Sequence, residues 1–167
     1  RSVKWSSYRV VSHGALILGL DHQPLASWHA HIDREVTRWA PRFTHAHEQI
    51  TRWVTTWNTN QSQPVSDPIR VSVISEDALK VYVSIKGPRQ ALTDLKSELK
   101  HLWSDGIIHH NDRNMALLPS YASKSRAVAH LQELITQTQT IEPLFVGVGD
   151  SVSDLSFLKL CHFAITP

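Results

Sequence analysis

The sequence predicts an α/β protein in which a partial Rossmann-like core is interrupted by an inserted α+β domain. Two observations carry this prediction. Residues 39–118 show apolar periodicity in the order helix, strand, strand, helix, strand, strand, which is typical of a four-stranded antiparallel sheet with both helices on one face. From residue 119 the order changes to helix, strand, helix, strand, which is typical of a doubly wound sheet. We therefore predict a core at residues 1–38 and 119–167 and an inserted α+β domain at residues 39–118.

The composition is that of a folded globular protein. Of the 167 residues, 41% are hydrophobic and 19% are charged, which disfavours disordered and coiled-coil proteins. The longest apolar runs fall far short of the roughly 20 residues that a membrane-spanning helix needs, so we expect no membrane partner. A single cysteine excludes an internal disulfide framework and suits a reducing compartment, which makes the cytoplasm the expected location.

Charge and the chain ends narrow the function further. The net charge is only +2, and the basic residues are scattered, so we expect no nucleic-acid partner. The chain opens at Arg1, and its only methionine is Met115. We therefore expect this sequence to be an internal piece of a longer protein.

The elements of the first third are unevenly predicted. Residues 9–20 are apolar and rich in β-branched side chains, which predicts a strand interrupted near Gly14. Residues 25–36 are ambiguous between strand and connector. In residues 44–57 apolar side chains recur at spacings of three and four, which predicts an amphipathic helix. Residues 58–68 are rich in Asn, Gln, Ser and Pro, which predicts a loop.

The middle of the chain alternates more regularly. Residues 69–75 and 79–85 alternate apolar and polar side chains and predict a hairpin. Residues 88–103 have leucines at helical spacing after a proline, which predicts a helix. Residues 107–111 and 115–118 predict a second pair of short strands. Together these strands make the four-stranded sheet of the inserted domain.

The last third contains the predicted α/β elements. Residues 123–138 have helical periodicity, and residues 151–159 predict a short helix. Residues 143–148 form a nearly continuous apolar run, which predicts a strand buried on both faces of a parallel sheet. Residues 163–166 predict the final strand.

Two carboxylates follow the apolar run. Asp150 would lie at the carboxyl end of that strand, where open α/β sheets bind ligands, and Asp154 follows one helical turn later. Oxygen ligands of this kind suit a hard divalent cation, especially Mg²⁺. The residue types leave a second interpretation equally open, in which Asp150 and Ser151 only cap the next helix.

Three segments resemble one family. Residues 149–154, Gly-Asp-Ser-Val-Ser-Asp, resemble the fourth motif of the haloacid dehalogenase (HAD) superfamily of phosphohydrolases. Residues 118–124, Leu-Pro-Ser-Tyr-Ala-Ser-Lys, resemble its lysine-bearing third motif. Residues 12–17, Ser-His-Gly-Ala-Leu-Ile, resemble the strand that precedes the cap in the branch containing sucrose-phosphate phosphatase and the Cof-like sugar phosphatases. The resemblance covers essentially the whole chain and favours the metal interpretation of the two carboxylates.

The resemblance implies a Mg²⁺-dependent phosphatase that hydrolyses a small phosphorylated metabolite, such as a sugar phosphate, through an aspartyl-phosphate. Asp150 and Asp154 would hold Mg²⁺, and Lys124 would be the catalytic cation. Gly14 and Ser151 would contact the substrate.

Two motifs of that family are missing from this sequence. The Asp-x-Asp motif that supplies the nucleophile is absent, as is the Ser or Thr motif that binds the phosphoryl group. Asp21 follows a predicted strand but lacks the paired aspartate, and Ser153 stands where Asn is common. We therefore expect the nucleophile to lie outside this chain, and the chain alone to be inactive.

Other functions stay open at this point. The main alternative is a noncatalytic binding or regulatory module that retains the HAD fold. A nucleic-acid-binding module is disfavoured because aromatic residues and a basic stripe do not coincide on the strands. The histidine pairs, such as His45 with His47, match no zinc-binding spacing. The sequence does not identify the substrate or the oligomeric state.

Overall fold

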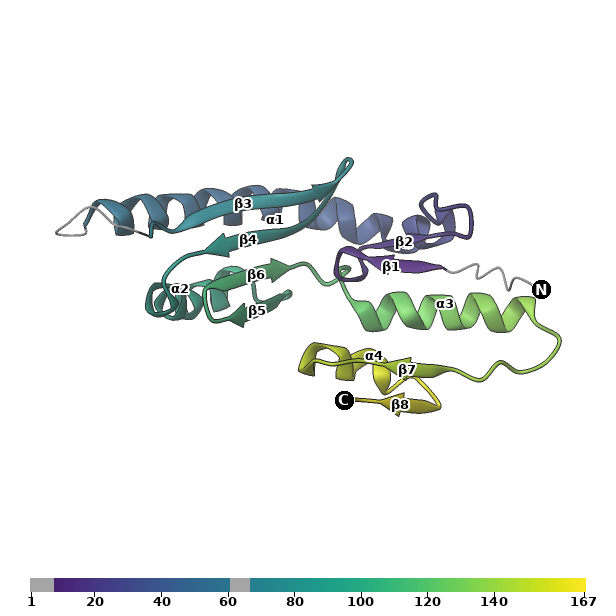
Figure 1. Cartoon of the computed structure of the whole chain (residues 1–167). Coiled ribbons are helices and arrows are strands. Elements are labelled where there is room, and N and C mark those ends of the chain that lie inside the picture. The colour runs from purple at the N-terminus through teal and green to yellow at the C-terminus, as the bar shows by residue number, and fades with distance from the viewer. Residues whose placement is uncertain (1–7, 61–66) are drawn as a thin grey trace. The chain divides into compact units, whose positions relative to one another are not determined.

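The computed structural model describes residues 8–60 and 67–167. The chain divides into two compact units, one made of residues 1–33 with 121–167 and the other of residues 34–120. The predicted domain boundaries lie at residues 38/39 and 118/119, within five residues of these. Helix α1 (Ala26–Thr59) begins in the first unit and continues into the second (Figure 1). None of the described helices is both long enough and apolar enough to cross a bilayer.

The second unit contains the predicted four-stranded antiparallel sheet, which the structure confirms. The strand order is β3-β4-β6-β5, and every neighbouring pair is antiparallel. Both hairpin turns contain an aspartate with positive φ, 51° at Asp77 and 51° at Asp112, a conformation that Asp tolerates better than most residues. The four strands are β3 (Arg70–Glu76), β4 (Leu79–Lys86), β5 (Ile107–Asn111) and β6 (Asn114–Leu118).

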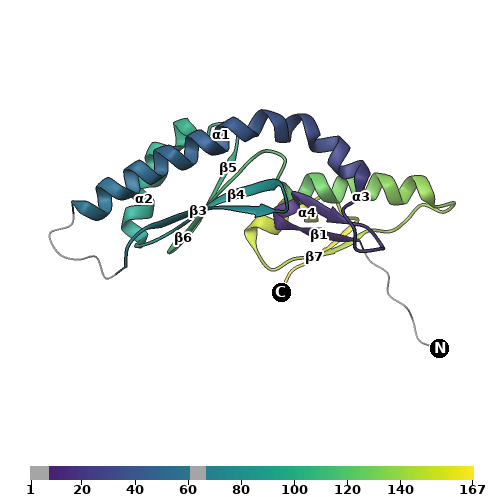
Figure 2. The same ribbon diagram turned by 90° about the horizontal axis from the view of Figure 1, so that it is seen from above.

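One face of this sheet and two helices form the core of the second unit. Figure 2 shows α1 and α2 (Arg89–Leu102) on the same side of the sheet. Trp103 follows α2 with 2% of its surface exposed, and its indole N–H donates a hydrogen bond of 2.8 Å to the Leu118 carbonyl. Its ring lies 4.8 Å from that of Trp39 and 5.6 Å from that of Phe43, between centroids. The aromatic cluster therefore ties both helices to the last strand of the sheet.

Helix α1 is much longer than predicted. It includes the predicted helix at residues 44–57, and also residues 26–36, which the sequence left ambiguous. Buried positions at Trp28, Ile32, Trp39 and Phe43 continue one apolar stripe at spacings of four and seven. Pro41 lies inside the helix, where a proline removes one backbone hydrogen bond. Because of this proline and the polar residues around the stripe, the sequence pattern did not predict one continuous helix. Residues 61–66 of the predicted loop lie outside the described residues.

The N-terminal strand prediction was wrong in one respect. Residues 9–20 form a hairpin of β1 (Arg9–Val11) and β2 (Leu16–Leu18) rather than one interrupted strand. The chain reverses at a short 3-10 turn, Ser12–Gly14, whose three residues all have positive φ. After the start of α1, this unit continues with the predicted helix α3 (Lys124–Thr138), which Ser123 caps by accepting a hydrogen bond from the Arg126 N–H.

The C-terminal strands form a parallel sheet, as predicted, but most of their residues are exposed. Strands β7 (Val146–Val148) and β8 (Phe163–Ile165) form a two-stranded parallel sheet, joined by a 3-10 turn and helix α4 (Leu155–Leu158). The prediction of burial on both faces was wrong, since Val148 is 66% exposed and Phe163 is 61% exposed. The physical reason is that, within the described residues, β7 pairs with β8 alone, and a sheet of two parallel strands lacks the coverage on both faces that buries the strands of larger parallel sheets.

Candidate functional site

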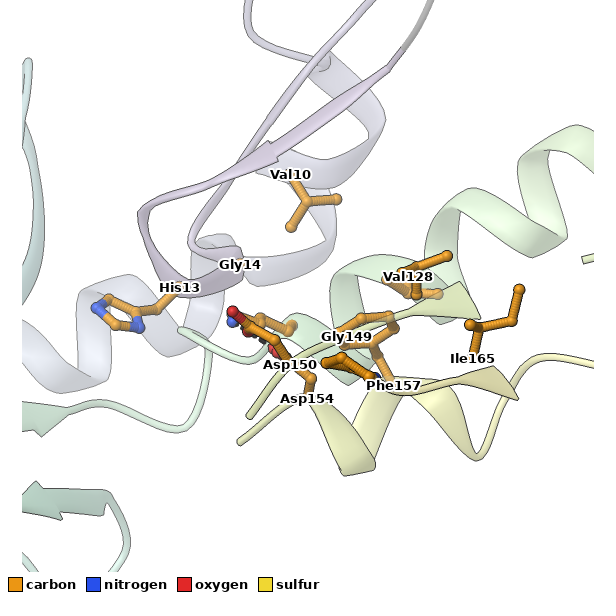
Figure 3. A pocket seen from close by; sticks show the side chains of 12 residues that line it. Val10, His13, Gly14, Val128, Gly149, Asp150, Asp154, Phe157 and Ile165 are labelled. Atoms are coloured by element: carbon orange, nitrogen blue, oxygen red, sulfur yellow. Dashed lines mark hydrogen bonds and ion pairs between the residues drawn. The ribbon is translucent and has the colours of Figure 1, made fainter. Parts of the chain in front are cut away.

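The first unit contains a pocket of about 660 Å³ at the carboxyl end of β7, which we call the β7 pocket. Figure 3 shows side chains from β1, α3, α4 and β8 around it, with the ring of His13 at its edge. One part is apolar and the other carries charged side chains. Its lining residues are Val10, His13, Gly14, Lys124, Val128, Val148, Gly149, Asp150, Asp154, Phe157, Ile165 and Pro167.

An ion pair joins the two motifs that the sequence placed 30 residues apart. The Lys124 ammonium donates a hydrogen bond of 2.7 Å to Oδ1 of Asp154. The Asp154 side chain is only 9% exposed, whereas that of Lys124 is 39% exposed. The hydrogen bond from Lys124, followed by that from Ser151, lowers the pKa of Asp154 to about 2, against the opposing effect of burial. Asp154 is therefore a carboxylate at any pH near neutrality.

Ser151 supports the same carboxylate from the other side. Its hydroxyl donates a hydrogen bond of 2.8 Å to Oδ2 of Asp154, and its backbone N–H donates one of 3.3 Å to the same oxygen. The backbone N–H of Asp154 in turn lies against the Ser151 side chain, and the two residues form a capping box at the 3-10 turn that precedes α4. The capping interpretation thus holds for Ser151, while Asp150 lies before the cap, exposed and facing the β7 pocket.

Two glycines allow this close packing. A Cβ on Gly14 would lie 2.4 Å from the Ser123 carbonyl carbon, so only glycine lets the 3-10 turn touch the start of α3. A Cβ on Gly149 would lie 2.7 Å from the Cβ of Asp154. Glycine at these positions therefore brings the β1–β2 turn and the Asp154 side chain into the pocket wall.

The structure brings most of the predicted site residues together. Lys124, Asp150, Asp154 and Gly14 all line the β7 pocket, while Ser151 acts on it through Asp154. No other acidic side chain of the described residues lines the pocket. His13 is a lining residue that the sequence did not single out, although a polar side chain inside an apolar run, directly before a glycine, was the available signal.

The donor set suits a hard cation better than a transition metal. Among residues 8–60 and 67–167, no three His, Cys, Asp or Glu side chains form a cluster that could hold a metal ion by themselves. The pocket offers two carboxylates instead, and Mg²⁺ is commonly held by one or two protein carboxylates, several waters and substrate phosphate oxygens.

Comparison with known proteins supports the fold. No family model matches the chain, and no curated protein matches its sequence. A solved structure, a haloacid dehalogenase-like hydrolase from Bacteroides thetaiotaomicron, is similar with a TM-score of 0.56 and 13% sequence identity. The match covers 96% of this chain and 71% of that one. The chain therefore has a partial HAD-like α/β fold, whose second unit carries the four-stranded antiparallel sheet.

Proposed function

We propose that the chain is part of a Mg²⁺-dependent HAD-like phosphatase that hydrolyses a small phosphorylated metabolite, such as a sugar phosphate. The observation that carries the proposal is the set of charges on one pocket: Lys124 held by Asp154 at 2.7 Å, with Asp150 exposed at the carboxyl end of β7. This edge of an α/β sheet is where such folds bind their ligands.

Lys124 supplies positive charge at a defined place. Its partner Asp154 is buried and is held in turn by Ser151, so the ammonium has a rigid support on one side. The other side of the lysine faces the pocket, where it can pair with an oxygen of a phosphoryl group. Its role in the reaction would be to neutralise negative charge as the phosphoryl group transfers.

The charge balance of the pocket favours a divalent cation. The positive charge of Lys124 and the negative charge of Asp154 cancel, so the negative charge of Asp150 remains. Without a cation, this charge would repel a phosphate dianion. Asp150 and Asp154 would hold Mg²⁺, with Asp154 still bonded to Lys124 and Ser151. When bound, the ion would neutralise phosphate oxygens and orient them. Ser151 and Lys124 hold the Asp154 carboxylate, and Asp154 in turn holds the Lys124 ammonium.

The nucleophilic carboxylate is proposed to come from a segment outside this sequence. Support comes from β1 and β7, which within the described residues each pair with one strand only, while Val10 of β1 and Val148 of β7 both line the pocket. A strand added beside β7 would cover this apolar lining and bring its carboxyl end close to Lys124. The reaction would then proceed through an aspartyl-phosphate on that strand.

Magnesium binding is the first test. Isothermal titration calorimetry of this chain should show that Asp150→Ala weakens Mg²⁺ binding at least tenfold. Asp21→Ala is the matched control, because Asp21 is another exposed carboxylate that follows a strand of the same unit. Unchanged Mg²⁺ affinity after Asp150→Ala would contradict the metal site.

Phosphate release is the second test and separates the catalytic proposal from a noncatalytic one. The full-length protein should hydrolyse members of a panel of sugar phosphates, and Lys124→Ala should lower kcat/KM by two or more orders of magnitude. The 167-residue chain should be inactive. A full-length protein that binds phosphate without hydrolysing esters would favour the noncatalytic module. Robust activity of the chain alone would mean that the nucleophile is misplaced, with Asp21 the first residue to mutate.

A further inference from the structure

The turn between β1 and β2 has an unusual backbone. Three successive residues have positive φ, with 52° at Ser12, 59° at His13 and 91° at Gly14. Glycine adopts this region freely, but in Ser and His the Cβ crowds the backbone carbonyl. Such conformations persist where the surrounding structure imposes them, and they are concentrated at functional sites.

The surroundings of this turn do impose it. Gly14 is packed so closely against Ser123 and the Lys124 backbone N–H that no side chain would fit between them. On the following side Ala15 is fully buried, and its N–H donates a hydrogen bond of 3.1 Å to the Ser12 carbonyl. The turn is thus attached to the start of α3, the helix that carries the lysine of the proposed site. The contact of Gly14 with the start of α3 therefore fixes the backbone of both His13 and Lys124.

His13 lies at the polar end of the β7 pocket. Figure 3 shows its ring on one side of Asp150 and Asp154, with Phe157 and Ile165 on the other side. The residue is exposed. If the phosphoryl group of a substrate lies beside Lys124 and Asp150, the described residues that line the apolar end offer the rest of the molecule no polar side chain. A polar organic group would therefore extend toward His13.

We propose that His13 is a specificity-determining residue that binds the organic part of the substrate, by a hydrogen bond between its imidazole and a hydroxyl close to the ester oxygen. The substrate class is then a polyhydroxy phosphate ester rather than a simple alkyl phosphate. An imidazole suits this role because its two nitrogens can donate and accept. This inference rests on the proposed function, since it takes the phosphoryl position from Lys124 and Asp150.

Binding to two esters separates this role from a structural one. The two esters are glucose 6-phosphate, which carries hydroxyls, and methyl phosphate, which carries none. The binding of each is measured by calorimetry with Mg²⁺ present. His13→Gly should weaken glucose 6-phosphate binding about fivefold, the range of a single hydrogen bond, and leave methyl phosphate binding unchanged. Glycine is the suitable replacement because it adopts φ near 59° without crowding, so the melting temperature should not fall. His13→Asn, which also tolerates this conformation and keeps polar groups, should recover part of the loss.

The outcomes are distinct. Equal weakening of both esters in the His13→Gly and His13→Asn variants would indicate a structural role and overturn the proposal, as would no change for either ester. The proposed function would survive both results, because wild-type binding of methyl phosphate would remain dependent on Lys124. If the wild-type chain binds neither ester, the phosphoryl site itself is absent and both proposals fail. In NMR spectra, the His13 ring signals should shift with glucose 6-phosphate and not with methyl phosphate.

Discussion

The two units differ in how completely their sheets are buried. In the second unit, β4 and β6 are central strands with buried side chains such as Val83 and Leu117, covered by two helices. In the first unit, the parallel pair β7–β8 leaves Val146, Val148 and Ile165 more than half exposed. Side chains of the same apolar character are thus core residues in one unit and surface residues in the other.

The difference follows from connectivity. The antiparallel strands of the second unit are joined by short turns, so residues 70–118 bring nearly all their partners with them. Parallel strands need long crossover connections and are stable mainly when both faces are covered. A sheet of local hairpins is complete within a short stretch of sequence, whereas a parallel sheet depends on strands that lie far apart in the chain.

The largest expected effect is in the aromatic cluster of the second unit. Trp103→Ala should lower the free energy of unfolding by about 3–5 kcal/mol, because it opens a cavity beside Trp39 and leaves the Leu118 carbonyl without its indole donor. Val148→Ala, at a 66% exposed position of β7, should change it by less than about 0.5 kcal/mol. Urea denaturation of both variants provides the measurement. Similar losses in the two variants would mean that β7 is as well packed as the second unit.

A somewhat smaller effect is expected for association. The exposed apolar face and open edge of β7–β8 should cause the chain to self-associate. The double variant Val148→Thr with Phe163→Thr removes apolar surface and places a β-branched side chain, which favours a strand, at both positions, so it should weaken self-association by about tenfold or more. Sedimentation equilibrium would measure this. A wild-type chain that stays monomeric at high concentration would contradict the expectation.

The Lys124–Asp154 ion pair should make a contribution to the stability of the first unit that is lost at acidic pH. The pKa of Asp154 is about 2, below its ordinary value of 3.8, so the folded state favours the carboxylate. The resulting stability is present above about pH 4 and is lost as the pH falls toward 2. Lys124→Met should therefore cost about 1 kcal/mol at pH 7, after allowance for the exposure of Lys124, and little near pH 2.

Lys159→Met is the matched control for this prediction, since Lys159 is an exposed lysine of the same unit. Urea denaturation from pH 7 to pH 2 would compare the two variants. Equal pH dependence in both would show that the ion pair does not contribute to stability.

The smallest expected effect concerns His130 of α3, whose Nε2 lies 3.0 Å from the Ser27 hydroxyl. Burial, and then the nearby His31, lower the pKa of His130 below 6.5, while Glu133 acts in the opposite direction. The folded state therefore favours the neutral ring, and stability is lost as the pH falls below 6.5. His130→Gln should reduce this loss, with a change within about 1 kcal/mol. His29→Gln, at an exposed position of α1, is the matched control.

Local pattern was enough to predict much of this protein. The alternation in residues 70–86 predicted the β3–β4 hairpin, and leucine spacing predicted α2, because these elements bury side chains against near neighbours in sequence. Asp150 and Asp154, which the sequence proposed as a pair, both line the β7 pocket, and their role as metal ligands stays a prediction.

Only the tertiary structure decided the features that depend on distant contacts. The hairpin at Ser12–Gly14 requires α3, against which Gly14 packs, and the length of α1 depends on what covers Trp28 and Trp39. The hydrogen bond from Lys124 to Oδ1 of Asp154 is another such feature, because 30 residues of sequence separate the two side chains. Periodicity records which face of an element is apolar, but it contains no information on which distant segment lies against that face.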